Sequence, residues 1–491
     1  MISLTPGPTI SYFADLAQLN PDAKIDPRTL KLSTIHAGVD ALIELPSSIE
    51  PSPVVIVCDE VEFLRDGISA KPLVRHLFEE AGFQVRVVHL TGDHIATTED
   101  HIMEVQAQLH PGDTVIALGS GVVADITKHA VFEFEKSGQQ LHLIVAQSAN
   151  SVCAFTSGMA VISMGSVKRT LMSRLPDRLV LDQRLLLDAP AEYSNGGIGD
   201  ASVAAVSFGD YRLSHLLGLT GWEPLAWQVM EFSRTRFLNQ DPVLVNGGLA
   251  QVDAIAMDLA ACGLAMTLAG ESAPLSGLEH VTSHTLDMAA GFHQRPIGNH
   301  GSQCALATIL SLIAWDILLA QDTLRLANPV DLDDEAEKSK LIQAFGPIDS
   351  DGSAWQECWR DYYSKLSTWR THQDDLVSFS TRWSDHREEL RGYIAKPVEF
   401  VSALHATNHP LAWEDIPTSI TTEMAKWAFL NARLMRKRTN VADLLALAGI
   451  WDNDFINEVF TVYQRLIRPL HHSDNHNNDP GRTDLESKEF S

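Results

Sequence analysis

The spacing of apolar residues divides the chain into two parts. Between residues 53 and 146, short and almost wholly apolar runs alternate with amphipathic stretches. Nearly continuous apolar runs of this length are typical of parallel strands that are covered on both faces. The first part therefore predicts an α/β domain built on a parallel sheet. Its strands are expected at 53–59, 84–90, 113–118 and 141–146, and its helices at 71–81, at 97–109 and from 125 onward.

From about residue 186 the pattern changes to longer segments with the apolar spacing of helices and no convincing strand between them. This part predicts an all-helical domain. Residues 322–352 and 369–420 are polar and look like insertions. We expect a dinucleotide-binding domain at 1–185, a helical metal and substrate domain at 186–470, and a disordered polar tail at 471–491. The helical segments are 200–218, 248–269, 276–290, 300–320, 338–346, 354–368 and 421–448.

Composition narrows the range of partners. The 63 Asp and Glu against 37 Lys and Arg leave a net charge of -26. Nucleic acid and anionic membranes are bound through positive surface, so neither is expected as a partner, whereas a small anionic substrate could still occupy a local basic pocket. The five cysteines show no C-x-x-C spacing, and we find neither a signal peptide nor an apolar run of about 18 residues. A cytoplasmic protein with reduced thiols is predicted.

A glycine-rich turn follows the strand expected at 113–118. Gly119, Ser120 and Gly121 would let a pyrophosphate approach the backbone at a helix N-terminus, where free N–H groups and a partial positive charge are available. A strand-to-helix turn also needs glycine for geometry alone, and neither G-x-G-x-x-G nor a P-loop is present. Asp59, at the end of the first strong strand, could accept hydrogen bonds from ribose hydroxyls and favour NAD over NADP. Helix capping by Asp59 is an equal alternative.

Three further residues have the chemistry of a metal site. Asp200 lies where the Gly-rich segment 196–200 enters a helix, His280 precedes His284 by four residues on one helical face, and His300 opens the next helix. One carboxylate and two imidazoles suit Zn²⁺ or Fe²⁺ and leave a position for a substrate oxygen. Each histidine alone is more often a satisfied polar residue, so the prediction depends on all three together.

Several motifs resemble the superfamily of iron-containing alcohol dehydrogenases, glycerol dehydrogenase and dehydroquinate synthase, and most closely its sn-glycerol-1-phosphate dehydrogenases. They span roughly residues 53–450 in the family's order. The matching segments are G-S-G-x-x-x-D-x-x-K at 119–128, V-K-R-T at 167–170, G-x-G-D at 197–200, L-S-H-L-L at 213–217, S-G-x-E-H-x-x-S-H-x-x-D-M at 276–288, H-G-x-Q at 300–303 and R-x-x-R-x-R-T-N-V-x-D-L-L at 433–445.

The resemblance implies a Rossmann-like domain followed by a helical metal domain, a small-molecule substrate and, by analogy only, a homodimer. His284 would face the substrate and relay a proton. Lys168 and Arg169 match a basic pair and could bind an anionic group, or could be a solvated surface pair. The implied ligands of a zinc, iron or nickel ion are Asp200, His280 and His300. The residues implied around NAD or NADP are Gly119, Ser120, Gly121, Asp125 and Lys128.

Three polar substrate positions of the family are changed. Val152 stands where an acid usually holds substrate hydroxyls, Ala204 where a lysine is common, and Ser302 where H-G-E would have its glutamate. Valine accepts no hydrogen bond, and an unpaired buried hydroxyl costs about 1–3 kcal/mol. We therefore expect hydride transfer between NAD(P) and a polyol- or polyol-phosphate-like alcohol or ketone other than glycerol 1-phosphate. The alternatives are a dehydroquinate-synthase-like cyclase or lyase that uses NAD transiently, and a binding protein that has lost catalysis.

Overall fold

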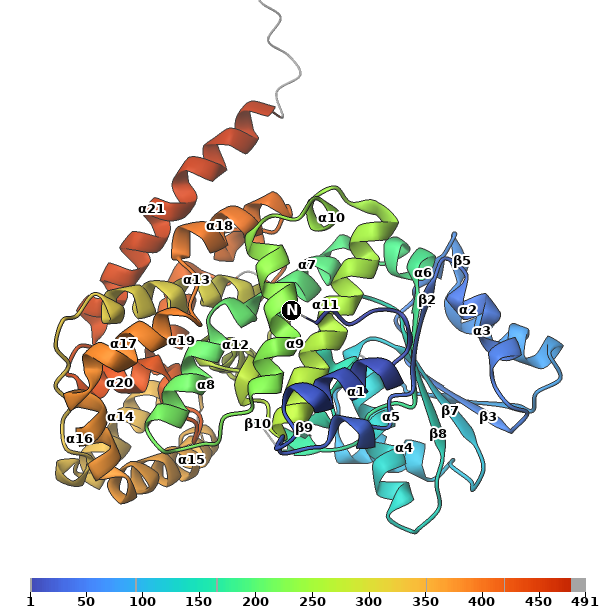
Figure 1. Cartoon of the computed structure of the whole chain (residues 1–491), viewed down its shortest axis with the longest axis horizontal. Coiled ribbons are helices and arrows are strands. Elements are labelled where there is room, and N and C mark those ends of the chain that lie inside the picture. Colours follow the sequence, from blue (N-terminus) through green and yellow to red (C-terminus); the bar gives the residue numbers. More distant parts are fainter. Residues whose placement is uncertain (1, 93–94, 165–166, 350, 419, 478–491) are drawn as a thin grey trace, which may run out of the picture.

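A seven-stranded sheet forms the N-terminal part, with the strand order β1-β2-β11-β8-β7-β3-β6 (Figure 1). A computed structural model describes residues 2–92, 95–164, 167–349, 351–418 and 420–477. Every pair in this sheet is parallel except β1 with β2. The strands are β1 (Gly7–Pro8), β2 (Thr34–Gly38), β3 (Val54–Cys58), β6 (Val85–His89), β7 (Thr114–Gly119), β8 (His142–Gln147) and β11 (Arg178–Asp182).

Both faces of this sheet are buried, as the apolar runs predicted. Successive residues of β3 belong to different cores: Val55 packs on one side and Ile56 on the other. The predicted α/β class and the strands β3, β6, β7 and β8 are confirmed. The helices of this part are α1 (Ile10–Leu19), α2 (Ala41–Glu44), α3 (Ala70–Glu80), α4 (Glu99–Gln106), α5 (Gly121–Glu135) and α6 (Gln183–Asp188).

The start of α5 corrects one prediction. The helix begins at Gly121, four residues before the expected start at Asp125, because Ser120 is extended and the first turn already runs through Gly121 and two valines. The ranges of β2 and β11 were not predicted, because their sequences, T-I-H-A-G and R-L-V-L-D, are less continuously apolar than that of β3. Two small antiparallel hairpins complete the strands: β4 (Leu64–Arg65) with β5 (Ile68–Ser69), and β9 (Met159–Met164) with β10 (Val167–Met172).

The C-terminal part is helical over the described residues after Asp182, as predicted (Figure 1). Its helices are α7 (Ala191–Ser202), α8 (Ser207–Leu216), α9 (Pro224–Leu238), α10 (Pro242–Val245), α11 (Gly248–Ala269), α12 (Leu278–Phe292), α13 (His300–Leu319), α14 (Asp334–Phe345), α15 (Ser353–Thr371), α16 (Gln373–Thr381), α17 (Trp383–Arg391), α18 (Pro397–Ala406), α19 (Thr422–Asn431), α20 (Val441–Leu447) and α21 (Asn453–Asn477). The short 3-10 helices are η1 (Pro27–Thr29), η2 (Leu45–Ser48), η3 (Cys153–Thr156), η4 (Val203–Ala205), η5 (Ala273–Leu275), η6 (Pro329–Asp331), η7 (Gly346–Ile348), η8 (Trp413–Asp415) and η9 (Ala432–Leu434).

The two polar segments read as insertions are folded into this domain. α14 lies in 322–352, and α16, α17 and α18 lie in 369–420. Their amphipathic helices each bury a few large residues among many polar ones, which is why the composition looked like loops. Trp369, Phe379, Trp383 and Phe400 are buried in the helical core.

Two central helices, α11 and α13, are long and apolar enough to cross a membrane by length and composition, contrary to the expectation that no such segment exists. In the structure 94% and 89% of their apolar windows are buried inside the protein. They are therefore the core helices of the fold. α11 joins the two parts, because Val252, Ala256 and Ala260 pack in the same cluster as the sheet residues Val55 and Val115.

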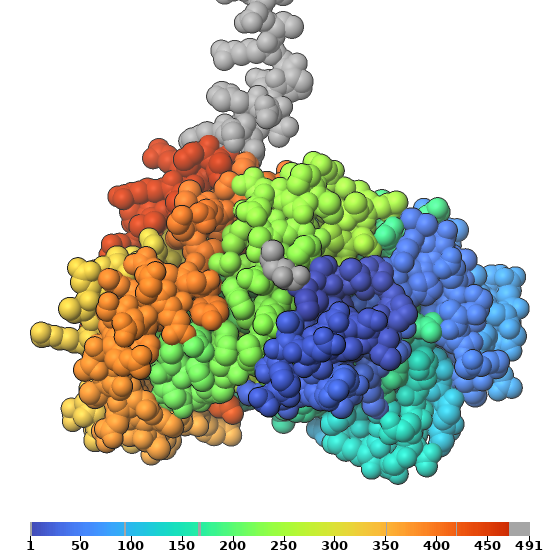
Figure 2. Space-filling view, in the orientation of Figure 1, coloured from blue at the N-terminus to red at the C-terminus, as the bar shows by residue number. Residues whose placement is uncertain are grey.

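The termini add two details. The N-terminal segment lies against both parts, since the backbone N–H of Lys24 donates to Glu223 at the start of α9; this segment is dark blue in Figure 2. At the other end, α21 continues to Asn477, so residues 471–477 are helical instead of belonging to a disordered tail. Residues 478–491 of the predicted tail lie outside the described residues. All five cysteines are free thiols, as expected.

Candidate metal and dinucleotide site

The metal site is formed where α7 crosses α13. The helices meet through glycines: a Cβ on Gly301 would lie 1.7 Å from the Gly196 carbonyl oxygen, and one on Gly199 would lie 2.1 Å from the Gly301 carbonyl oxygen. No other residue fits at this distance. The close crossing brings Asp200, at the end of α7, next to His300, the first residue of α13. α12 supplies His280 from a third direction.

The three predicted ligands converge on one point. Asp200 Oδ1 lies 3.3 Å from His280 Nε2 and 3.8 Å from His300 Nε2. Asp200 is 2% exposed, and its Oδ1 has no hydrogen-bond partner among the described residues. The other carboxylate oxygen, Oδ2, accepts the backbone N–H of Cys153 at 2.7 Å. A buried carboxylate oxygen that faces two imidazole nitrogens without a donor between them is suited to a cation.

Hydrogen bonds on the far side of each imidazole orient the donor atoms. Ser283 Oγ donates to Gln303 Oε1 at 2.7 Å, so the same hydroxyl is an acceptor for His300 Nδ1 at 2.9 Å. His280 Nδ1 faces Glu279 Oε1 at 3.2 Å. Both rings therefore carry a proton on Nδ1 and direct Nε2 toward Asp200. Such outer partners commonly fix the tautomer of metal-binding histidines.

The pKa shifts of these groups reflect their mutual attraction. Burial raises the pKa of Asp200, but the neighbouring imidazoles of His280 and His300 outweigh it and lower this pKa to about 2. Burial lowers the pKa of His280, but Cys304, Asp200 and Glu279 raise it well above its usual value. His300 is likewise raised, against burial, chiefly by Cys304. Positive charge is thus favoured at this point, and without a metal it is supplied by protons.

A cysteine missing from the sequence prediction completes the cluster. The ligand atoms of Asp200, His280, His300 and Cys304 all lie within 4.8 Å of one another. Cys304 follows His300 by four residues and so lies one helical turn further along the same face of α13. This four-residue spacing is the sequence signal from which the fourth donor could have been predicted. The donor set of one carboxylate, two imidazoles and one thiol fits a divalent metal such as zinc.

A cavity of about 340 Å³ opens beside this cluster, where the resemblance placed the substrate. His284 lines it, and its ring stacks on His300 with 5.2 Å between the centroids. Burial, together with the charges of His300, Arg436 and Lys168, lowers the pKa of His284 well below its usual value. Its Nδ1 has no hydrogen-bond partner among the described residues. His284 is therefore a neutral imidazole facing the cavity, as a proton acceptor requires.

The predicted basic pair is divided between two surroundings. Lys168 and Arg169 are neighbours on β10, so their side chains point to opposite faces. Lys168 lines the cavity and contacts Asp287 at 3.0 Å. Arg169 is directed to Glu357 and Asp361 of α15 and does not line the cavity. The second cation of the cavity is Arg436, which the sequence prediction missed although it lies within the matching motif at 433–445.

The glycine turn lies at a favourable point of the sheet. β3 is followed by β6 on one side, whereas β7 lies on its other side. The strand order therefore reverses between β3 and β7, and ligands of open α/β sheets bind outside the carboxyl ends of strands at such points. Gly119 ends β7, and Asp59 directly follows β3. Asp59 is buried and forms an ion pair with Lys71 at 2.8 Å. A ribose hydroxyl that binds Asp59 would therefore share the carboxylate with Lys71.

Asp125 and Lys128 have partners within the fold. Lys128 is fully buried, contacts Asp125 at 3.0 Å and donates to the carbonyls of Ser157 and Met159 at 3.0 and 2.9 Å. Asp125 also accepts the backbone N–H of Val161. The pair holds the segment after β8 against α5. These contacts show a structural role, and a contact of either residue with a dinucleotide stays a prediction.

The turn and the metal cluster are linked through two consecutive residues. A Cβ on Gly121 would lie 2.4 Å from Val152 Cγ2, so the valine packs directly on the turn. Cys153, the next residue, donates its backbone N–H to Asp200. The carboxyl edge of the sheet therefore borders the metal cluster. This arrangement is suited to a cofactor held at the turn while its reactive end approaches a substrate at the metal.

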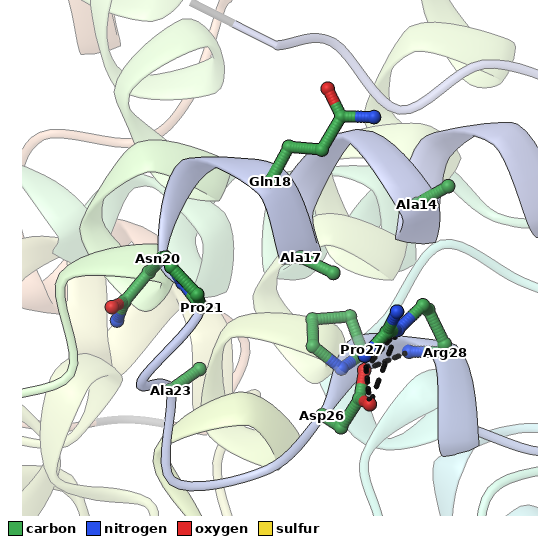
Figure 3. Close-up of a pocket in the computed structure, with 9 residues that line it drawn as sticks. All are labelled: Ala14, Ala17, Gln18, Asn20, Pro21, Ala23, Asp26, Pro27 and Arg28. Carbon is green, nitrogen blue, oxygen red and sulfur yellow. Dashed lines mark hydrogen bonds and ion pairs between the residues drawn. The ribbon is translucent and has the colours of Figure 1, made fainter.

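A second cavity, of about 280 Å³, lies between α1 and η1 (Figure 3). Its two charged residues, Asp26 and Arg28, are hydrogen-bonded to each other at 2.7 Å. No histidine or cysteine lines it. It therefore lacks the chemistry of the cluster around Asp200.

Comparisons with known proteins agree with this geometry. The family model for iron-containing alcohol dehydrogenase matches residues 39–190. The glycerol-1-phosphate dehydrogenase [NAD(P)+] of Bacillus subtilis (strain 168) is 26% identical over 323 residues, covering 64% of this chain and 80% of that protein. The protein of the same name from Halalkalibacterium halodurans is 30% identical over 201 residues, which is 40% of this chain and 48% of that relative. In sequence the chain is thus similar to iron-containing alcohol dehydrogenases over residues 39–190 and to glycerol-1-phosphate dehydrogenases over a longer stretch.

Solved structures of this superfamily show the same fold. The glycerol dehydrogenase of Schizosaccharomyces pombe matches with a TM-score of 0.53 at 14% identity, over 89% of this chain and 91% of that one. A probable glycerol dehydrogenase from Sinorhizobium meliloti 1021 matches with a TM-score of 0.51 at 16% identity, over 89% and 97%. The recognition of the superfamily and of its two-part fold is confirmed.

The three changed positions lie in three different places in the fold. Val152 packs on the turn, Ala204 is buried in η4, and Ser302 is buried in the first turn of α13, where its backbone N–H is capped by Asn299. None of the three presents a charged group to the cavity beside His284. The charges that line this cavity come instead from Lys168, Asp287 and Arg436.

Proposed function

We propose that this chain transfers hydride between NAD(P) and a small polyol- or polyol-phosphate-like alcohol or ketone. The single observation that supports this most is the position of Asp200. Its unpartnered Oδ1 faces two imidazole nitrogens, and its Oδ2 is bound by the residue after Val152, which packs on the glycine turn.

Asp200, His280 and His300 would hold a divalent metal. When bound, such an ion acts as a Lewis acid toward a substrate oxygen, and the nicotinamide exchanges the hydride. The protein contributes orientation: the hydrogen bonds of Ser283 and Glu279 fix both imidazoles before a ligand arrives. The turn at Gly119, Ser120 and Gly121 would hold the pyrophosphate, and Val152 would form an apolar wall between the two ligands.

His284 would exchange the proton that accompanies hydride transfer. Its ring contacts His300 on one side and the cavity on the other. The nearby positive charges keep it neutral, so a lone pair is available when an alcohol is oxidised. In ketone reduction the same nitrogen would return the proton from solvent.

An anionic group on the substrate would be held by Lys168 and Arg436. Lys168 is partly neutralised by Asp287 at 3.0 Å. Arg436 has no carboxylate within ion-pair distance among the described residues, and one of its nitrogens donates to the Lys168 carbonyl. A half-buried guanidinium without a carboxylate partner is suited to a phosphate or carboxylate of the substrate.

The test begins with metal content and dinucleotide binding of purified wild type and His280→Ala. We expect about one metal per chain in the wild type, little in the variant, and binding of NAD(H) or NADP(H) to both. Ketones with and without a phosphate are then screened for NADH or NADPH oxidation. A His280→Ala protein that keeps both metal and activity would exclude this assignment.

The same assay separates the two rival functions. A cyclase or lyase regenerates its NAD, so it would convert substrate without net consumption of NADH. A binding protein that has lost catalysis would hold neither metal nor dinucleotide in the wild type. The four clustered donors argue against a binding protein that has lost catalysis. Among the described residues, no hydrogen bond to Asp200 Oδ1 takes the place that a metal would occupy. The cytoplasmic location and the homodimer stay predictions.

A further inference from the structure

Cys304 is placed with the predicted metal ligands although the family resemblance assigned it no role. Its side chain is fully buried, and its Sγ lies 3.7 Å from His300 Nε2. The same nitrogen lies 3.8 Å from Asp200 Oδ1. The sulfur also lies 4.0 Å from His300 Nδ1, so it is placed beside the ring, and the ligand atoms of Cys304 and Asp200 lie within 4.8 Å of each other.

The distances match those between ligands of one tetrahedral ion. Zinc bonds of about 2.0–2.1 Å to nitrogen or oxygen and about 2.3 Å to sulfur place neighbouring donors about 3.4–3.6 Å apart. The observed separations are 3.3 Å for Asp200 to His280, 3.8 Å for Asp200 to His300 and 3.7 Å for Cys304 to His300. The one separation that involves the fourth donor is close to this range, and all four ligand atoms lie within 4.8 Å of one another.

Other polar groups near the cluster do not compete for this position. Ser283 is occupied by Gln303 and His300, and Glu279 accepts from the backbone N–H of Gly277 at 2.7 Å. Cys153 also lies near Asp200, but it is not among the residues whose ligand atoms converge. Among the four residues whose ligand atoms converge, Asp200 Oδ1 has no hydrogen-bond partner and Cys304 Sγ contacts only the neighbouring ligands in the contacts described above.

We propose that Cys304 is a fourth protein ligand, so that this chain holds its metal with Asp200, His280, His300 and a thiolate. The proposal rests on the metal site of the proposed function and specifies its chemistry. Carboxylate and thiolate together carry two negative charges, which balance a divalent cation. A soft sulfur donor favours zinc over magnesium or manganese. Substrate oxygen would then enter as a fifth ligand or displace one of the four.

The test uses cobalt as a spectroscopic substitute for zinc in the full-length protein. Cobalt-loaded wild type should show a sulfur-to-cobalt charge-transfer band in the near ultraviolet beside its visible bands. Cys304→Ser should bind cobalt without this band and should bind zinc about 100-fold or more weakly, beyond the 10- to 100-fold loss typical of an outer partner. Cys153→Ser, which changes the other nearby thiol, should keep the band, and so should Cys358→Ser in the buried core of α15.

A second measurement needs no variant. X-ray absorption at the zinc edge of the wild type should show one sulfur at about 2.3 Å beside nitrogen and oxygen at about 2.0–2.1 Å. Only nitrogen and oxygen neighbours, or a charge-transfer band that survives in Cys304→Ser, would overturn the proposal while leaving the metal site and the proposed function intact. A wild type that binds neither zinc nor cobalt would overturn both.

Discussion

The helical domain buries two charged clusters with opposite bonding. In the first, Lys365 contacts both oxygens of Asp443 at 2.9 Å, and Arg433 lies 3.4 Å from the same carboxylate. Asp443 also accepts from the backbone N–H of Asn440 in a capping box. In the second cluster, Asp200 Oδ1 faces two imidazole nitrogens and has no hydrogen-bond partner among the described residues.

The difference indicates which cluster is structural and which is functional. A buried charge is tolerated when opposite charges and hydrogen bonds surround it, as around Asp443. Burying two lone-pair donors against a carboxylate is unfavourable unless a cation occupies the space between them. The first cluster is complete within the protein, and the second requires a ligand. The cations of the two regions differ in the same way. Lys365 forms an ion pair with Asp443, whereas Arg436, which lines the cavity, has no carboxylate partner among the described residues.

Removing the carboxylate from each cluster gives the largest expected contrast. Asp443→Asn leaves Lys365 and Arg433 without their anion and should lower the free energy of unfolding by about 3–5 kcal/mol. Asp200→Asn should change the stability of the metal-free protein by about 2 kcal/mol or less, but should abolish metal binding. Urea denaturation and metal analysis of both variants test this. Equal losses of stability would remove the distinction between the clusters.

The unpaired cation of the cavity should matter for substrate binding. Arg436→Met should raise KM for a phosphate- or carboxylate-bearing ketone by about 10- to 150-fold, because a hydrogen bond to a charged group contributes about 1.5–3 kcal/mol. Arg169→Met is the matched control, since Arg169 is committed to Glu357 and Asp361. The KM of Arg169→Met should stay within about twofold of the wild-type value. Steady-state kinetics on charged and uncharged ketones would contradict this proposal if Arg436→Met affected both alike.

The helix crossing that assembles the second cluster should tolerate no side chain. A Cβ at residue 301 collides with the Gly196 carbonyl, so Gly301→Ala should separate α7 from α13, lower stability by about 1–3 kcal/mol and weaken metal binding. Gly291→Ala, in α12, meets nothing within 4 Å and should change stability by at most about 1 kcal/mol, in favour of folding. Thermal unfolding measures the stability of the two variants, and cobalt titration measures their metal affinity. Full metal affinity in Gly301→Ala would show that the close crossing is unnecessary.

The smallest expected effect is on pH dependence without metal. The pKa of His280 is raised in the folded state, so its contribution to stability is present below about pH 6.5 and is lost as pH rises through the folded pKa. The pKa of Asp200 is lowered to about 2, so its contribution is lost only as pH falls from about 4 toward 2. Metal-free protein should therefore lose stability above pH 6.5, by at most about 1.4 kcal/mol per pH unit for one proton.

Urea unfolding in a chelator at several pH values measures this slope, with His280→Gln as the variant that cannot titrate. Excess zinc should reverse the trend, because protons no longer compete with the metal at higher pH. A metal-free wild type whose stability does not change between pH 6.5 and 9 would mean that His280 carries no extra proton in the folded state.

Much of the molecule could be predicted from the pattern of residues. Strands β3, β6, β7 and β8 are nearly unbroken apolar runs, and α11, α12 and α13 keep a helical spacing over many residues. Asp200, His280 and His300 carry motif spacing strong enough to be selected together. The polar segments that became α14, α16, α17 and α18 were missed because a surface helix buries only a narrow stripe.

The sequence by itself determined the two-part fold and the three residues that would bind a metal, because backbone periodicity and motif spacing are local. Only the tertiary structure decided which neighbours these residues have. It divided Lys168 from Arg169, brought Arg436 to the cavity, committed Lys128 to buried carbonyls, and added Cys304 to the ligand set. The cluster around Asp200 depends on contacts between helices far apart in the chain, which are fixed by packing at points such as Gly199 and Gly301.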